Sequence, residues 1–60
     1  LQKAILSLPR KQRLTFNFRY YDELSFSAIA EITDTTPDGA KANWHNAKIK
    51  ISNYLKENNG

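Results

Sequence analysis

The chain has 60 residues and a formal net charge of +3, with 40% hydrophobic and 25% charged side chains. This length allows one small domain that buries roughly 60% of the surface exposed by its unfolded chain, and the composition is typical of a soluble globular domain. The absence of cysteine excludes disulfides and thiolate metal sites, and no apolar run approaches the length of a membrane span or a signal-peptide core.

The first half of the chain predicts two short helices separated by a proline. The first helix is expected over residues 1–7, where four apolar side chains share one face, namely Leu1, Ala4, Ile5 and Leu8. Pro9 disfavours helical geometry at the residue before it and suits the start of a second helix, expected over residues 9–20. The inward stripe of this second helix is aromatic, because Phe16 and Tyr20 lie four residues apart.

The second half predicts two helices joined by a three-residue turn, which is the layout of a helix-turn-helix motif. The shorter helix is expected over residues 26–32 and the longer one over residues 37–56, with a length of roughly 30 Å. Together with the first two helices, they predict an all-α, four-helix domain over residues 1–56. Residues 57–60 are expected to form a frayed tail.

Local signals mark the ends of the two later helices. Ser25 and Thr36 are expected to cap them, because each hydroxyl can accept a hydrogen bond from an otherwise unpaired backbone N–H. Pro37 suits the first position of the longer helix, where its missing N–H has no cost. Asp34 suits the turn, because aspartate tolerates the left-handed conformation better than most residues.

One face of the longer helix is apolar and is expected to pack on the core. Its side chains follow a spacing of three and four residues and are Ala40, Trp44, Ala47, Ile51 and Leu55. We interpret Trp44 as a core anchor rather than as a platform for stacking bases. Ile49 lies on the opposite, polar face, where it is either a partner contact or an ordinary exposed isoleucine.

Charge is unevenly distributed along the chain. Residues 1–21 carry five basic side chains and no acid, whereas residues 22–38 carry five acids and no base. This pattern fits a phosphate-binding surface beside a protein-docking surface, and it fits ordinary solvated faces equally well. Arg13 and Arg19 could also pair with nearby acids, although exposed pairs of this kind contribute little to stability.

An ordered set of short motifs runs through nearly the whole chain. In chain order they are Ala4-Ile5, Leu8-Pro9, Arg13 with Phe16, Arg19-Tyr20-Tyr21, Leu24-Ser25-Phe26, Ile29-Ala30-Glu31-Ile32, and Lys41 with His45 and Ala47. Over residues 1–55 this set resembles region 4, the C-terminal DNA-binding domain of bacterial extracytoplasmic-function (ECF) sigma factors.

The resemblance implies the function and the partners of the chain. In that family the domain recognises the minus-35 element of double-stranded promoter DNA while the flap of the beta subunit holds it on the RNA polymerase core. Some relatives are restrained by an anti-sigma factor. We therefore expect a cytoplasmic protein with no membrane partner, no small-molecule substrate and no cofactor. Because the chain begins with leucine in a helix, we also expect it to be a piece of a longer protein whose N-terminal domains are absent.

An inserted recognition helix offers the outward face of its N-terminal half to base edges. The residues expected to contact DNA are Ser25, Thr36, Asp38, Gly39, Lys41, Ala42, Asn43, His45, Asn46 and Lys48. Lys41 can donate to guanine, and Asn43 or Asn46 can pair with adenine. Ser25 and Thr36 stand at helix starts, which favour phosphate. Asp38 either accepts from a cytosine amino group or only interacts with the helix dipole.

The chain departs from the family pattern at several positions. Ala28 replaces a common acidic residue that would complete a capping box with Ser25. Asp34 replaces the usual glycine of the turn. The start of the recognition helix usually resembles Gly-Thr-Val-Lys-Ser-Arg, and here residues 38–43 differ from it. With Asn46 in place of a second arginine, two cations of the family pattern are neutral.

Two other functions fit the same sequence. The motif could be the output domain of a free-standing regulator, which would usually dimerise on a palindromic site. The chain could also be a helical protein-interaction module without DNA binding. Catalysis is not expected, because one histidine and no cysteine leave no set of residues for a metal site or an activated nucleophile.

Overall fold

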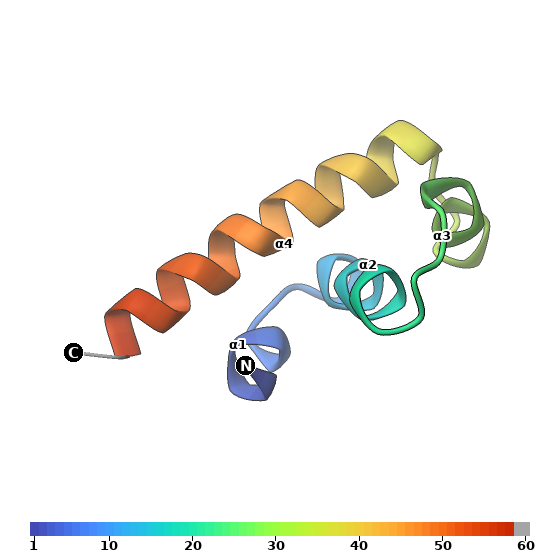
Figure 1. Cartoon of the computed structure of the whole chain (residues 1–60). Helices are drawn as coiled ribbons and strands as arrows, with labels where there is room; N and C mark the ends of the chain where they lie inside the picture. The colour runs from blue at the N-terminus through green and yellow to red at the C-terminus, as the bar shows by residue number, and fades with distance from the viewer. Residues whose placement is uncertain (59–60) are drawn as a thin grey trace.

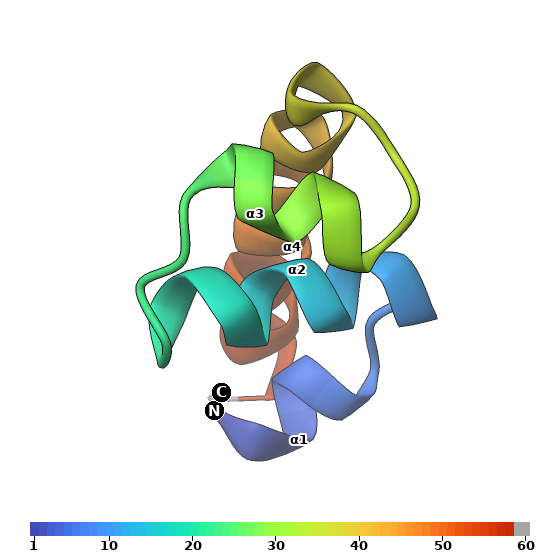
Figure 2. The same cartoon turned by 90° about the vertical axis from the view of Figure 1, so that its right-hand side faces the viewer.

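The computed structural model describes residues 1–58, and these form four helices, as the sequence predicts. In chain order they are α1 (Gln2–Leu6), α2 (Arg10–Tyr20), α3 (Phe26–Ile32) and α4 (Pro37–Asn58). Helix α4 runs along the whole molecule, and the other three helices pack against one side of it (Figure 1). In the view turned by 90°, helix α2 lies between α3 and α1 (Figure 2). The predicted all-α fold with a helix-turn-helix is confirmed.

The ends of three helices differ slightly from the prediction. The first helix was expected over residues 1–7, whereas α1 spans Gln2–Leu6. Pro9 precedes α2 as its cap residue, with an extended backbone at φ −55° and ψ 152°, so the helix itself begins at Arg10. Helix α4 continues through Glu57 and Asn58, which fall in the segment expected to fray. The side-chain amide of Asn58 donates to the carbonyl oxygen of Tyr54 at 2.9 Å, which ties the last residue of α4 to the turn before it. Residues 59–60 of the expected tail lie outside the described residues.

The core consists of two clusters along α4. The larger cluster joins α1 and α2 to the middle of α4, and its buried members are Ala4, Ile5, Leu8, Phe16, Ala47 and Ile51. The smaller cluster joins α3 to the first turns of α4, and its buried members are Ile29, Ala30 and Ala40. Each half of α4 therefore has its own apolar support, and the smaller cluster fixes the angle between the two helices of the helix-turn-helix.

Trp44 packs against the larger cluster, as expected of a core anchor. Its ring stacks on Phe16 with 5.2 Å between ring centroids, and Phe16 in turn stacks on Tyr20 at 5.1 Å. Offset stacking of this kind adds to the free energy gained from burying the rings. The side chain of Trp44 is only half-buried, so it covers the core from the side rather than filling its centre.

Three residues expected on apolar faces are exposed instead. Leu1, the N-cap of α1, is 50% exposed. Leu55 is 43% exposed, because the last turns of α4 extend beyond α1 (Figure 1). The neighbouring Tyr54 packs against the larger cluster in its place. Tyr20 is 52% exposed, since it is the last residue of α2 and only one face of its ring meets Phe16.

Two connections contain a left-handed residue. Asp34 has φ 56°, as the turn of the helix-turn-helix requires, and the N–H of Thr35 closes the turn on the carbonyl oxygen of Ala30 at 2.9 Å. Glu23 has φ 54° in the connection between α2 and α3, which the sequence does not predict. There the N–H of Leu24 donates to the carbonyl oxygen of Phe18 at 3.1 Å, so the chain reverses tightly between the two helices.

Candidate nucleic-acid interface

Both helices of the helix-turn-helix begin with the caps that the sequence predicts. The N–H of Ala28 donates to Ser25 Oγ at 3.1 Å, and the N–H of Gly39 donates to Thr36 Oγ1 at 3.0 Å. Both cap residues are exposed. Because a hydroxyl is also a donor, each keeps its own proton available for an acceptor such as a phosphate oxygen.

Most of the side chains expected to contact DNA are exposed on α4. Its buried residues define the inward face, so a helical period places Asp38, Ala42 and His45 on the opposite face. In chain order, the residues of this set that are exposed on α4 are Asp38, Lys41, Ala42, His45, Asn46 and Lys48. Asn43 is half-buried beside the inward face, so of the two asparagines Asn46 is the better placed for a base edge.

Gly39 is half-buried. The structure shows why a glycine stands at this position, which the sequence does not reveal. A Cβ atom at this position would lie 2.6 Å from Thr35 Oγ1 and 3.1 Å from Thr36 Oγ1. The glycine therefore makes room for the two hydroxyls at the start of α4. A close approach to DNA is not needed to explain this residue.

The two lysines of the set lie over aromatic rings. Lys41 Nζ is 6.0 Å from the ring centroid of Phe26 at the start of α3, and Lys48 Nζ is 5.4 Å from that of Trp44. The lysines are seven residues apart, or two helical turns, so both lie on the same flank of α4. This flank is adjacent to the outward face, and both ammonium groups remain exposed.

Arg19 contributes a third cation near this flank. Its guanidinium lies 4.6 Å from the ring centroid of Phe26, and its Nη1 donates to the carbonyl oxygen of Leu24 at 3.0 Å. The sequence left open a pairing with nearby acids. The observed contacts instead hold the connection between α2 and α3, which a local pattern could not predict because it depends on how the two helices pack.

Comparison with known protein families identifies the family of this chain. The family model described as Sigma-70, region 4 matches residues 1–51, a range that includes α1, α2, α3 and most of α4. The chain belongs to the sigma-70 region 4 family. As a region 4 domain it binds promoter DNA within a sigma factor. Searches of curated proteins and of solved structures gave no match.

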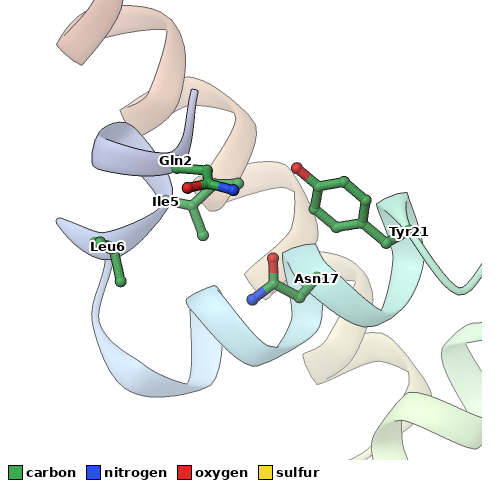
Figure 3. Close-up of a pocket in the computed structure, with 5 residues that line it drawn as sticks. All are labelled: Gln2, Ile5, Leu6, Asn17 and Tyr21. Carbon is green, nitrogen blue, oxygen red and sulfur yellow. The ribbon is translucent and has the colours of Figure 1, made fainter.

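Region 4 of this chain also has two hollows on its surface. One, of about 270 Å³, lies between α1 and α2 and is lined by Gln2, Ile5, Leu6, Asn17 and Tyr21 (Figure 3). Two large side chains that line it, Leu6 and Tyr21, are 67% and 56% exposed. The sequence did not single out this surface, because its pattern assigned no contact to Leu6 and placed Tyr21 in a polar connection.

The second hollow, of about 330 Å³, lies on the outward face of α4 and is lined by His45, Lys48, Ile49, Ser52 and Asn53. Ile49 is 46% exposed, so the structure places this candidate partner contact beside His45 and Lys48. Within residues 1–58 no group of three or more histidine, aspartate or glutamate side chains is placed to hold a metal ion. Nor does that part of the chain contain a helix long and apolar enough to cross a membrane.

Proposed function

We propose that this region 4 domain recognises the minus-35 element of promoters as part of an ECF-type sigma factor and so directs transcription initiation. The observation that supports this function best is the exposed N-terminal half of α4, which follows a capped helix-turn-helix in a chain of the sigma-70 region 4 family. A helix in this position enters the major groove with its first turns against the base edges.

Within the groove, the residues of α4 would divide into base contacts and backbone contacts. Lys41 donates to the O6 and N7 atoms of a guanine, and Asn46 pairs with an adenine. Ala42 keeps the outward face narrow and can meet a thymine methyl. Ser25 and Thr36 donate their hydroxyl protons to phosphates on either side of the groove, where the partial positive charge at the start of α4 adds to the attraction.

The hollow between α1 and α2 is the place where the flap of the polymerase beta subunit would dock. Its lining combines the apolar surface of Ile5, Leu6 and Tyr21 with the amides of Gln2 and Asn17. Helix α2 lies between α1 and α3 (Figure 2). A protein bound there leaves the start of α4 accessible to DNA. An anti-sigma factor that covers either surface would block promoter recognition. The contacts with DNA, polymerase and anti-sigma factor would all be made in the bacterial cytoplasm.

Docking on the polymerase also explains how so small an interface can select a promoter. One short helix and two caps supply few phosphate contacts, so the free domain should bind weakly and with a steep dependence on salt. Tethering to a polymerase that already contacts the promoter raises the effective concentration of the domain at its site.

The test is transcription from a promoter library with randomised upstream sequence, using core RNA polymerase and the sigma factor that carries this domain. We expect polymerase-dependent enrichment of one upstream element, and we expect Lys41→Ala to relax the preference at one or two base pairs, each worth about 1–3 kcal/mol of discrimination. Lys56→Ala is the matched control, since this exposed lysine lies near the far end of α4.

Two results would contradict the proposal. If no element is enriched, the chain does not select promoters, and a protein-interaction module becomes the better interpretation. If Lys41→Ala and Lys56→Ala change the enriched element equally, recognition does not occur at the start of α4.

A further inference from the structure

The ring of Phe26 connects two cations that come from different helices. The guanidinium of Arg19, on α2, lies 4.6 Å from the ring centroid, and Lys41 Nζ, on α4, lies 6.0 Å from the same centroid. Phe26 is itself the first residue of α3. One aromatic side chain therefore joins all three helices that position the candidate interface.

The ring is fixed, whereas the lysine is not. Phe26 is half-buried against the cluster of Ile29, Ala30 and Ala40, and Ser25 caps the helix that carries it. Arg19 adds its hydrogen bond to the Leu24 carbonyl, two residues before the ring. Lys41 is exposed and would otherwise sample many rotamers in solution, which DNA binding would have to restrict.

The distances from Arg19 and from Lys41 to the Phe26 ring differ, and the difference matters for how Lys41 can bind DNA. At 4.6 Å Arg19 is well within the range of a cation–π interaction, whereas at 6.0 Å Lys41 is at its outer limit. The ring therefore attracts the ammonium group without holding it tightly. A guanine in the groove, which offers two strong acceptors, can therefore bind the ammonium group while the lysine side chain stays beside the ring.

We propose that Phe26 is a specificity-determining positioning residue, whose ring biases Lys41 toward the conformations that reach a guanine base edge. The inference rests on the proposed promoter recognition and adds a residue that does not itself touch a base. Arg19 has a supporting role, because it ties the ring to α2. The contribution expected from an exposed cation–π contact corresponds to about a two- to fivefold change in preference.

The chain offers a matched control for this proposal. Phe18 packs against the same small cluster and is also half-buried, while the observed cation contacts on that side of the domain are made to Phe26. Phe26→Leu and Phe18→Leu therefore remove a similar amount of apolar surface, and only the first removes the ring beneath Lys41. Phe26→Tyr keeps an aromatic face and serves as the rescue variant.

The measurement is the affinity of the polymerase holoenzyme for its selected element, divided by its affinity for the element with the Lys41-dependent base pair changed. We expect Phe26→Leu to lower this ratio about two- to fivefold, and Phe26→Tyr and Phe18→Leu to leave it unchanged. Phe26→Leu combined with Lys41→Ala should lower the ratio no further than Lys41→Ala alone, because the ring acts through the lysine.

The proposal is overturned if Phe26→Leu and Phe18→Leu change the ratio equally, or if the effects of Phe26→Leu and Lys41→Ala multiply independently. A wild-type protein without any preference would instead overturn promoter recognition, and the positioning role with it. Should Phe26→Leu fail to fold, nuclear Overhauser contacts between the Lys41 methylenes and the Phe26 ring in the wild-type chain decide the matter. Their absence contradicts the proposal, and their presence supports it.

Discussion

Individual hydroxyl groups stabilise this domain unequally. Thr33 is 7% exposed, and its Oγ1 donates to the carbonyl oxygen of Ile29 at 2.8 Å, so this buried hydroxyl has a partner at the end of α3. Thr15 is completely buried in α2, yet its Oγ1 has no hydrogen-bond partner among the described residues. A buried hydroxyl without a partner loses its bonds to water and gains nothing in return.

We therefore predict that Thr15→Val raises the free energy of unfolding by about 1 kcal/mol. Valine has nearly the same shape and a similar helix propensity, so the main change is removal of the unpaired hydroxyl. Thr33→Val is the control and should lower the free energy of unfolding by about 1 kcal/mol, because its hydroxyl is paired. Urea denaturation followed by circular dichroism measures both changes. A loss of stability in Thr15→Val would show that its hydroxyl is paired in solution.

At the scale of the elements, α4 combines two functions in one helix. Its inward face carries both apolar clusters, and its outward face carries most of the residues expected to contact DNA. Any change that loosens the inward face should therefore disturb recognition as well. Because α1 and α3 are only 5 and 7 residues long, they depend on packing against the longer helices for their stability.

Trp44 gives the prediction that tests this dependence. Trp44→Ala should lower the free energy of unfolding by about 3 kcal/mol, the lower end of the cost of truncating a core aromatic, because the ring is half-buried and stacks on Phe16; this is comparable to the whole stability of a domain of this size. Leu55→Ala, on the same stripe but exposed, should change the free energy of unfolding by no more than about 0.5 kcal/mol. Thermal unfolding followed by circular dichroism distinguishes them. Cooperative unfolding of Trp44→Ala at an unchanged midpoint would contradict a core role for this ring.

The sequence predicts those features that depend on a few neighbouring residues. Ser25, Thr36 and Pro37 mark helix starts through chemistry that lies within three residues of each, and Asp34 marks the turn through its own backbone preference. All four positions agree with the structure. The exposure of Leu1, Tyr20 and Leu55 and the left-handed Glu23 were missed, because helical periodicity does not tell where a neighbouring helix ends.

The candidate site was predictable to a similar extent. Periodicity places most of the expected residues on the outward face of α4, since that face follows from the apolar stripe alone. The contacts around Phe26 could not be predicted in this way, because Arg19, Phe26 and Lys41 come from three helices. The reason for Gly39 also depends on packing, since it involves the rotamers of Thr35 and Thr36.

At the scale of the whole molecule, the two candidate binding surfaces are separate. The start of α4 lies beside α3 at one end (Figure 1), and the hollow between α1 and α2 lies toward the other. With α2 between them, DNA and a polymerase subunit could bind at the same time. This arrangement suits a domain that connects a promoter to an enzyme. It requires that α4 is the element that faces the DNA, and this is the claim to test.

The most direct test of that claim uses the absence of cysteine from the chain. A single cysteine introduced by Ala42→Cys, on the outward face of α4, can carry an iron chelate that cleaves nearby DNA. In the promoter complex with RNA polymerase we expect cleavage at the minus-35 element from this position, and none from Lys56→Cys near the far end of α4. Cleavage from Lys56→Cys alone, or from neither position, would contradict the account.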